Sequence, residues 1–132
     1  MQGCSVTDLN IHSKHNCYKL DTATMQKLQE ETGVSTQLQP GTYIIRIRDG
    51  AFNYQTSSGQ QSGEPLVMLW IYGGKFINKK TNITVEATWS TLNGNDDTLT
   101  LEVIETATLC AFFFDSYLED NEGEVTLSVV KI

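Results

Sequence analysis

The sequence has few basic side chains and no long apolar run. Its 132 residues include 9 Lys and Arg against 16 Asp and Glu, which gives a net charge of −7 with neutral histidines. Proteins hold the phosphate backbone of nucleic acids through Lys and Arg, so this balance argues against nucleic acid as a partner. The longest apolar stretches, residues 65–72 and 108–114, are far shorter than the roughly 20 residues of a membrane-spanning helix, which argues against membrane insertion.

Two further features are missing. The N-terminus has neither a basic start nor an apolar stretch, so no cleaved signal peptide is expected, and we expect a protein that is cytoplasmic or secreted by a leaderless route. The cysteines Cys4, Cys17 and Cys110 are odd in number and form no disulfide framework. These absences leave the cellular compartment open.

The acidic charge is concentrated in one segment. Residues 115–124 contain five acids and no Lys or Arg, and the rest of the chain has 11 acids against 9 bases, a net charge of −2. Such a run is most often a solvated loop. Its second interpretation is a cation site, because calcium takes six to eight oxygens from carboxylates, amides and backbone carbonyls. The EF-hand order of acids is absent, so that type of calcium site is excluded.

From residue 41 onward, apolar residues alternate with polar ones or form short continuous runs. This pattern predicts six strands, at residues 42–48, 66–72, 83–89, 99–103, 109–114 and 125–129. No helical period separates them, so the sequence predicts an all-β fold, an antiparallel β-sandwich or jelly roll. Turn residues such as Gly73 and Gly74 are expected to reverse the chain, and Trp70, Trp89 and residues 112–114 are expected to fill the interior.

Residues 1–39 are predicted to be an N-terminal extension to a β-sandwich domain at residues 40–132. A short helix is expected over residues 22–32, with Asp21 as N-cap and Gly33 at its end. Its apolar stripe is narrow, Met25 and Leu28, so the helix is expected to lie on the sandwich.

The extension also collects both histidines of the chain, His12 and His15, between Cys4 and Cys17. Thiolate and imidazole are ligands of zinc, but this spacing matches no usual zinc pattern. A Cys4–Cys17 disulfide and free thiols with surface histidines are the other interpretations. An enzyme is not expected, because the only histidines that could serve as a base lie in this extension, Cys110 is in an apolar strand and no Gly-rich phosphate loop is present.

Three segments of residues 40–132 bear on the ligand. They are Pro-Gly-Thr-Tyr-Ile-Ile-Arg-Ile with Gly-Ala-Phe-Asn-Tyr at 40–54, Glu-Pro-Leu-Val-Met at 64–68, and Phe-Asp-Ser-Tyr-Leu-Glu-Asp-Asn-Glu-Gly-Glu-Val at 114–125. Together they resemble the LecA-type lectins of bacteria, which are calcium-dependent, galactose-binding jelly-roll sandwiches. The resemblance implies one calcium ion that bridges protein and sugar. Its ligands would be the backbone carbonyls of Tyr54 and Tyr117 and the side chains of Asp115, Asp120 and Asn121.

The sugar-contacting His-Pro-Asp-Gln segment of that family has no counterpart here, so the resemblance implies a carbohydrate, possibly a galactoside, without fixing its identity. We expect the sugar to be contacted by side chains beside the calcium site, namely Phe52, Asn53, Gln55, Gln60 and Gln61. The alternative is a structural sandwich without metal, which uses a sheet edge or face and the N-terminal extension to form a homo-oligomer or to bind another protein.

Overall fold

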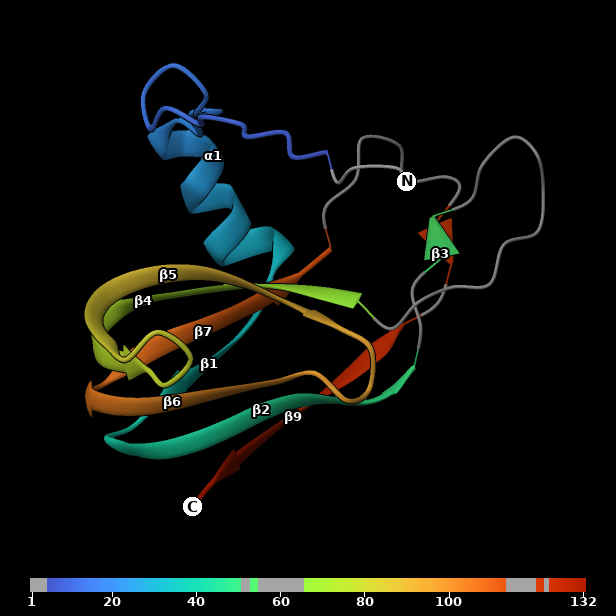
Figure 1. Ribbon diagram of the computed structural model, residues 1–132. Helices are drawn as coiled ribbons and strands as arrows, with labels where there is room; N and C mark the ends of the chain where they lie inside the picture. The colour runs from blue at the N-terminus through green and yellow to red at the C-terminus, as the bar shows by residue number, and fades with distance from the viewer. Residues whose placement is uncertain (1–4, 51–52, 55–65, 114–120, 123) are drawn as a thin grey trace.

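The computed structural model of the protein describes residues 5–50, 53–54, 66–113, 121–122 and 124–132. It confirms an all-β fold with one short helical segment near the N-terminus (Figure 1). All six expected strands are present, and the described residues form three further strands, of which one joins the main sheet and two pair separately. The elements are α1 (Thr22–Lys27), η1 (Leu28–Thr32), β1 (Val34–Leu38), β2 (Gly41–Gly50), β3 (Asn53–Tyr54), β4 (Leu66–Asn78), β5 (Ile83–Asn93), β6 (Thr98–Glu105), β7 (Ala107–Phe112), β8 (Asn121–Glu122) and β9 (Val125–Lys131).

Within the described residues, seven strands form one antiparallel sheet that curls back on itself. The sheet folds at β4, because residues 68–72 of this strand pair with β7, whereas residues 75–78 pair with β6. β1 extends the first half beyond β7, and β2 and β9 extend the second half beyond β6. The two layers of the expected sandwich are therefore two halves of one continuous sheet.

The prediction of a turn at Gly73 and Gly74 is wrong, because both residues lie inside β4. The pairing of β4 with β5 shifts register around them, as at a β-bulge. A Cβ on Gly74 would lie 2.2 Å from the carbonyl oxygen of Thr106, an approach that only glycine allows. The chain reverses later, at residues 79–82, where Asn82 adopts a φ of 62°.

The space between the two halves of the sheet holds the main hydrophobic core. Leu69, Ile71 and Phe76 of β4 are fully buried there. Ile45 of β2 and Leu101 of β6 reach the same core from the other half. Close packing of such side chains is the main source of stability in a domain of this size.

Trp70, Trp89 and Phe112 were expected in this interior, and that prediction is wrong. They lie on the outer face of the β4–β7 half, with the Trp70 and Trp89 rings 4.3 Å apart and the Phe112 ring edge-on to Trp89 at 6.1 Å. The reason is strand alternation: the odd positions 67, 69 and 71 of β4 point inward, so Trp70 must point outward. Phe113 is half-buried beyond the end of β7, and Phe114 lies outside the described residues.

The helical segment covers this outer face, as predicted for residues 22–32 (Figure 1). The Asp21 side chain caps it by accepting a hydrogen bond from the Thr24 N–H at 2.7 Å. Leu28 packs against Cys110 and Phe112. The segment ends at Gly33 as expected, but Gly33 has an extended conformation, and glycine is required because a Cβ would lie 2.1 Å from the Cys110 sulfur.

β1 lies in the segment that was expected to be an extension of the β domain. It pairs with β7 along all five of its residues, from Val34 opposite Ala111 to Leu38 opposite Ala107. Leu38 alone among its side chains is buried. The main sheet therefore begins at Val34, directly after the helical segment.

Candidate functional site

A separate two-stranded ribbon joins the two segments from which the calcium site was predicted. β3 and β8 pair antiparallel, with Tyr54 opposite Asn121 and Asn53 opposite Glu122. Figure 1 shows this ribbon beyond the end of the main sheet. Residues directly opposite one another in such a ladder have Cα atoms about 4.5–5.5 Å apart. The fold thus places the Tyr54 backbone beside the Asn121 backbone, although 66 residues separate them in the sequence.

The main sheet holds the base of this ribbon together. Gly50, at the end of β2, is the register partner of Val125, at the start of β9. Gly50 has a φ of 103°, and a Cβ on it would lie 2.0 Å from the carbonyl oxygen of Glu124. A larger residue at position 50 would push the end of β2 away from the start of β9. The segments that follow β2 and precede β9 are therefore adjacent where they leave the main sheet, and they pair again as β3 and β8.

The other predicted site residues lie outside the described residues, so their positions stay predictions. For the calcium ion, the fold brings two of the five expected ligand residues together, Tyr54 and Asn121. For the sugar, Asn53 lies next to Tyr54 in β3. The expected residues without a described position are Asp115, Tyr117 and Asp120 for the metal, and Phe52, Gln55, Gln60 and Gln61 for the carbohydrate.

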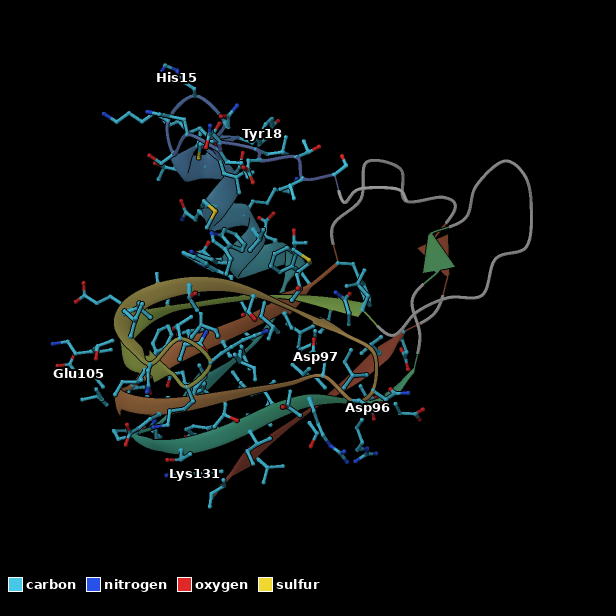
Figure 2. All side chains as sticks on the ribbon, viewed as in Figure 1. His15, Tyr18, Asp96, Asp97, Glu105 and Lys131 are labelled. Carbon is cyan, nitrogen blue, oxygen red and sulfur yellow. The ribbon has the colours of Figure 1, made fainter. Side chains whose placement is uncertain are left out.

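A further acidic turn lies at the same end of the main sheet, and the sequence analysis did not select it. It connects β5 to β6 and carries Asp96 and Asp97 (Figure 2). The Asp97 carboxylate accepts a hydrogen bond from the Asn93 N–H at 3.0 Å, so it closes the turn. Asp96 is exposed. Residues 93–96, Asn-Gly-Asn-Asp, are typical of a turn, and the pairing of Thr98 with Arg46 places this turn at the end of the sheet where β2 leaves toward β3.

The Cys and His residues of the N-terminal segment do not form a metal site in the described structure. The His12 and His15 rings are 4.4 Å apart, but His12 Nδ1 accepts hydrogen bonds from the backbone N–H groups of Lys14 and His15. Cys17 is an exposed free thiol, and Cys4 lies outside the described residues. Among the residues that the structure places, no group of three or more His, Cys, Asp or Glu side chains could hold a metal ion.

An aromatic hollow lies between the N-terminal segment and the outer face of the sheet. Its volume is about 280 Å³, and Trp89, which is 46% exposed, forms part of its wall. Beside it, Trp70 stacks on Tyr72 with ring centroids 5.8 Å apart, and its buried indole nitrogen has no hydrogen-bond partner among the described residues. The hollow is lined by Tyr18, Leu20, Leu28, Met68, Trp89 and Phe112.

The electrostatics of this face favour a neutral hydroxyl at Tyr72. Burial raises the pKa of Tyr72, and the nearby Cys110 and Glu30 raise the same pKa further. The sequence analysis did not identify this face as a candidate site, although Trp70 and Tyr72, two residues apart in an apolar strand, were a signal for an aromatic face.

Comparison with known proteins gives no family for the chain. No family model matches it, and no curated protein or solved structure is significantly similar to it. None of the helices in the described part is long and apolar enough to cross a membrane. The function must therefore be argued from the residues and the geometry of this protein itself.

Proposed function

We propose that the protein binds a carbohydrate through a calcium ion held between the segment at Tyr54 and the acidic segment at residues 115–121. The observation that supports this proposal is the register of the β3–β8 ribbon, in which Tyr54 lies opposite Asn121. The resemblance to the LecA-type lectins implies both residues as calcium ligands, and the register makes their backbones neighbours.

The donor set fits the chemistry of calcium. Calcium binds oxygen ligands of several kinds at 2.3–2.6 Å and tolerates irregular geometry. Asp115 and Asp120 would supply carboxylate oxygens, Asn121 an amide oxygen, and Tyr54 and Tyr117 backbone carbonyls. Five acids within residues 115–124 repel one another, so a divalent cation at this segment would also relieve unfavourable charge.

Two hydroxyl groups of a sugar would complete the oxygen shell of the ion. Side chains beside the metal would orient the ring by hydrogen bonds from Asn53, Gln55, Gln60 and Gln61 and by stacking on Phe52. This division of roles gives affinity to the ion and selectivity to the surrounding side chains.

A thermal-shift titration with calcium tests the metal. Calcium that binds only the folded protein raises the melting temperature by mass action, and we expect Asp115→Ala with Asp120→Ala to remove the rise. The matched control is Glu86→Ala with Glu105→Ala, which removes two exposed acids of β5 and β6 away from the acidic turn and should keep the rise (Figure 2 labels Glu105). Absence of a shift at millimolar calcium would exclude the metal.

A glycan array probed with and without a chelator tests the sugar. We expect binding with calcium and loss of binding with the chelator. Binding that survives the chelator would show a carbohydrate site that is independent of calcium. Calcium binding without any glycan signal would leave a metal-binding protein and contradict the carbohydrate proposal.

A further inference from the structure

An apolar cleft opens on the side of the curled sheet where its two ends meet. Its volume is about 790 Å³. One wall is β1 and the other is β9, and the floor is formed by inward-facing residues of β4 and β7 such as Val67 and Leu109. Val34 of β1 is on this wall and is 79% exposed. The floor residues themselves are buried, so the exposed apolar surface of the cleft lies on its walls, at Val34 and at the partly buried residues of β9.

Both walls of the cleft are sheet edges. Within the part of the chain that the structure describes, β1 pairs only with β7, and β9 pairs only with β2. The inward residues of β9, Val125, Leu127 and Val129, pack against the core but remain only partly buried. An open sheet edge with partly exposed apolar side chains is a template for one more strand.

The N-terminal segment carries apolar side chains that the described residues leave exposed. Residues 5–11 precede the helix and have no secondary structure. Val6, Leu9 and Ile11 are 81%, 79% and 78% exposed. These three side chains expose apolar surface that a second chain could cover.

We propose that residues 5–11 of one copy of the chain add as an antiparallel strand to the free edge of β9 in a second copy, over the cleft. Ile11 opposite Val125 fixes a register in which Leu9 lies opposite Leu127, and both point into the cleft. The same register puts Val6 opposite Val130, which is 50% exposed on the outer face. All three apolar residues of the segment thus meet apolar residues of β9.

The positions of the charged side chains are also favourable in this register. The one charged residue of the segment, Asp8, falls opposite Ser128, which is itself the partner of the exposed Arg46 on β2. Asp8 and Arg46 would then lie on the outer face of one sheet, two strands apart. A shift of the segment by two residues toward Ile132 would instead place Asp8 opposite Val130, which is less favourable.

Such an interface is head-to-tail, since the segment and the cleft are different surfaces of the chain. Interfaces of this type produce rings or open filaments, because each copy still offers one free segment and one free cleft. The proposal is independent of calcium and of sugar.

The oligomeric state of the full chain tests this assembly, measured by sedimentation velocity over a range of concentrations. We expect species larger than a monomer, and we expect Leu9→Glu or Val34→Glu to abolish them. Both residues are largely exposed, so neither variant should prevent folding, which circular dichroism checks. The matched controls are Asn10→Lys, which places a charge on the outward side of the same segment two strands from Asp49, and Ile83→Glu, at an exposed aliphatic residue on β5, and both should assemble like the unmodified chain.

A mixing experiment distinguishes this geometry from a symmetric dimer. The Val34→Glu chain keeps its segment and the Leu9→Glu chain keeps its cleft, so an equimolar mixture should form a complex of two chains and stop there. A monomeric unmodified protein at every concentration would overturn the proposal. Assembly that survives both substitutions, or a mixture that forms no complex, would overturn it as well.

Discussion

The side chains on the two faces of β4 and β7 are buried to different extents. The inner face meets the other half of the sheet, and its side chains, such as Leu69 and Leu109, are almost completely buried. Among the described residues, the outer face meets the N-terminal segment, whose one buried residue is Leu28, and its aromatic side chains line a hollow. A sheet covers a sheet along its whole length, whereas a short helix covers it along one stripe. The continuous apolar runs of these two strands therefore indicated that both faces are covered, but they did not indicate that the two faces are unequally buried.

The largest effect is expected from the inner face. Phe76→Ala should reduce the free energy of unfolding by about 3–5 kcal/mol, because the ring is fully buried and a cavity would remain. Urea denaturation measures this loss. Trp89→Ala is the comparison on the outer face, where 46% exposure should make the loss smaller despite the larger side chain. Equal losses would contradict the difference between the faces.

An intermediate effect is expected where the helix meets the outer face. Leu28→Ala should cost about 2 kcal/mol, at the lower end for a buried leucine, because one side of its site is already hollow. The tryptophan emission should also shift to the red as Trp70 and Trp89 become more hydrated. Gln26→Ala, at an exposed position of α1, should change neither quantity. A loss of stability without a shift in tryptophan emission would argue against packing of the helical segment over Trp70 and Trp89.

The smallest effect is expected at the exposed end of the helix. Hydrogen bonds from the Thr24 side chain and backbone lower the pKa of Asp21. A lowered pKa means that the folded state favours the carboxylate, so this stabilisation is present at neutral pH and is lost as the pH falls through the acid range of Asp. Asp21→Ala should therefore lower the melting temperature at pH 7, by less than Leu28→Ala does. The two proteins should converge in acid, and a constant difference across pH would contradict the assignment.

Local sequence signals predicted most elements of this fold. Alternation along β6 and β9 needs no tertiary information, because a half-buried strand requires polar and apolar residues in turn. Asp21 before a helical segment was equally informative, since its carboxylate can satisfy a free backbone N–H. β1 was missed because four of its five side chains are exposed and its strand conformation comes from pairing with β7.

Two errors came from distant contacts. Gly73 and Gly74 resemble a hairpin turn, and their role as a bulge depends on Thr106, more than 30 residues later in the sequence. Trp70 and Trp89 suit an interior by size, but their outward direction depends on which face of β4 meets the other half of the sheet. The candidate site was predictable as two segments, whereas their meeting at Tyr54 and Asn121 required the β3–β8 pairing.

The sequence by itself determined the all-β class, the position of the helix and the concentration of acids in one segment, because each depends on neighbouring residues. The tertiary structure decided which apolar face is inner and which is outer, where the sheet folds, and which edges remain open beside the cleft. These properties arise from pairing between residues far apart in the chain, and no local pattern specifies such partners. Ile11 and Val125 are therefore unremarkable as sequence, and they become possible partners only beside an uncovered sheet edge.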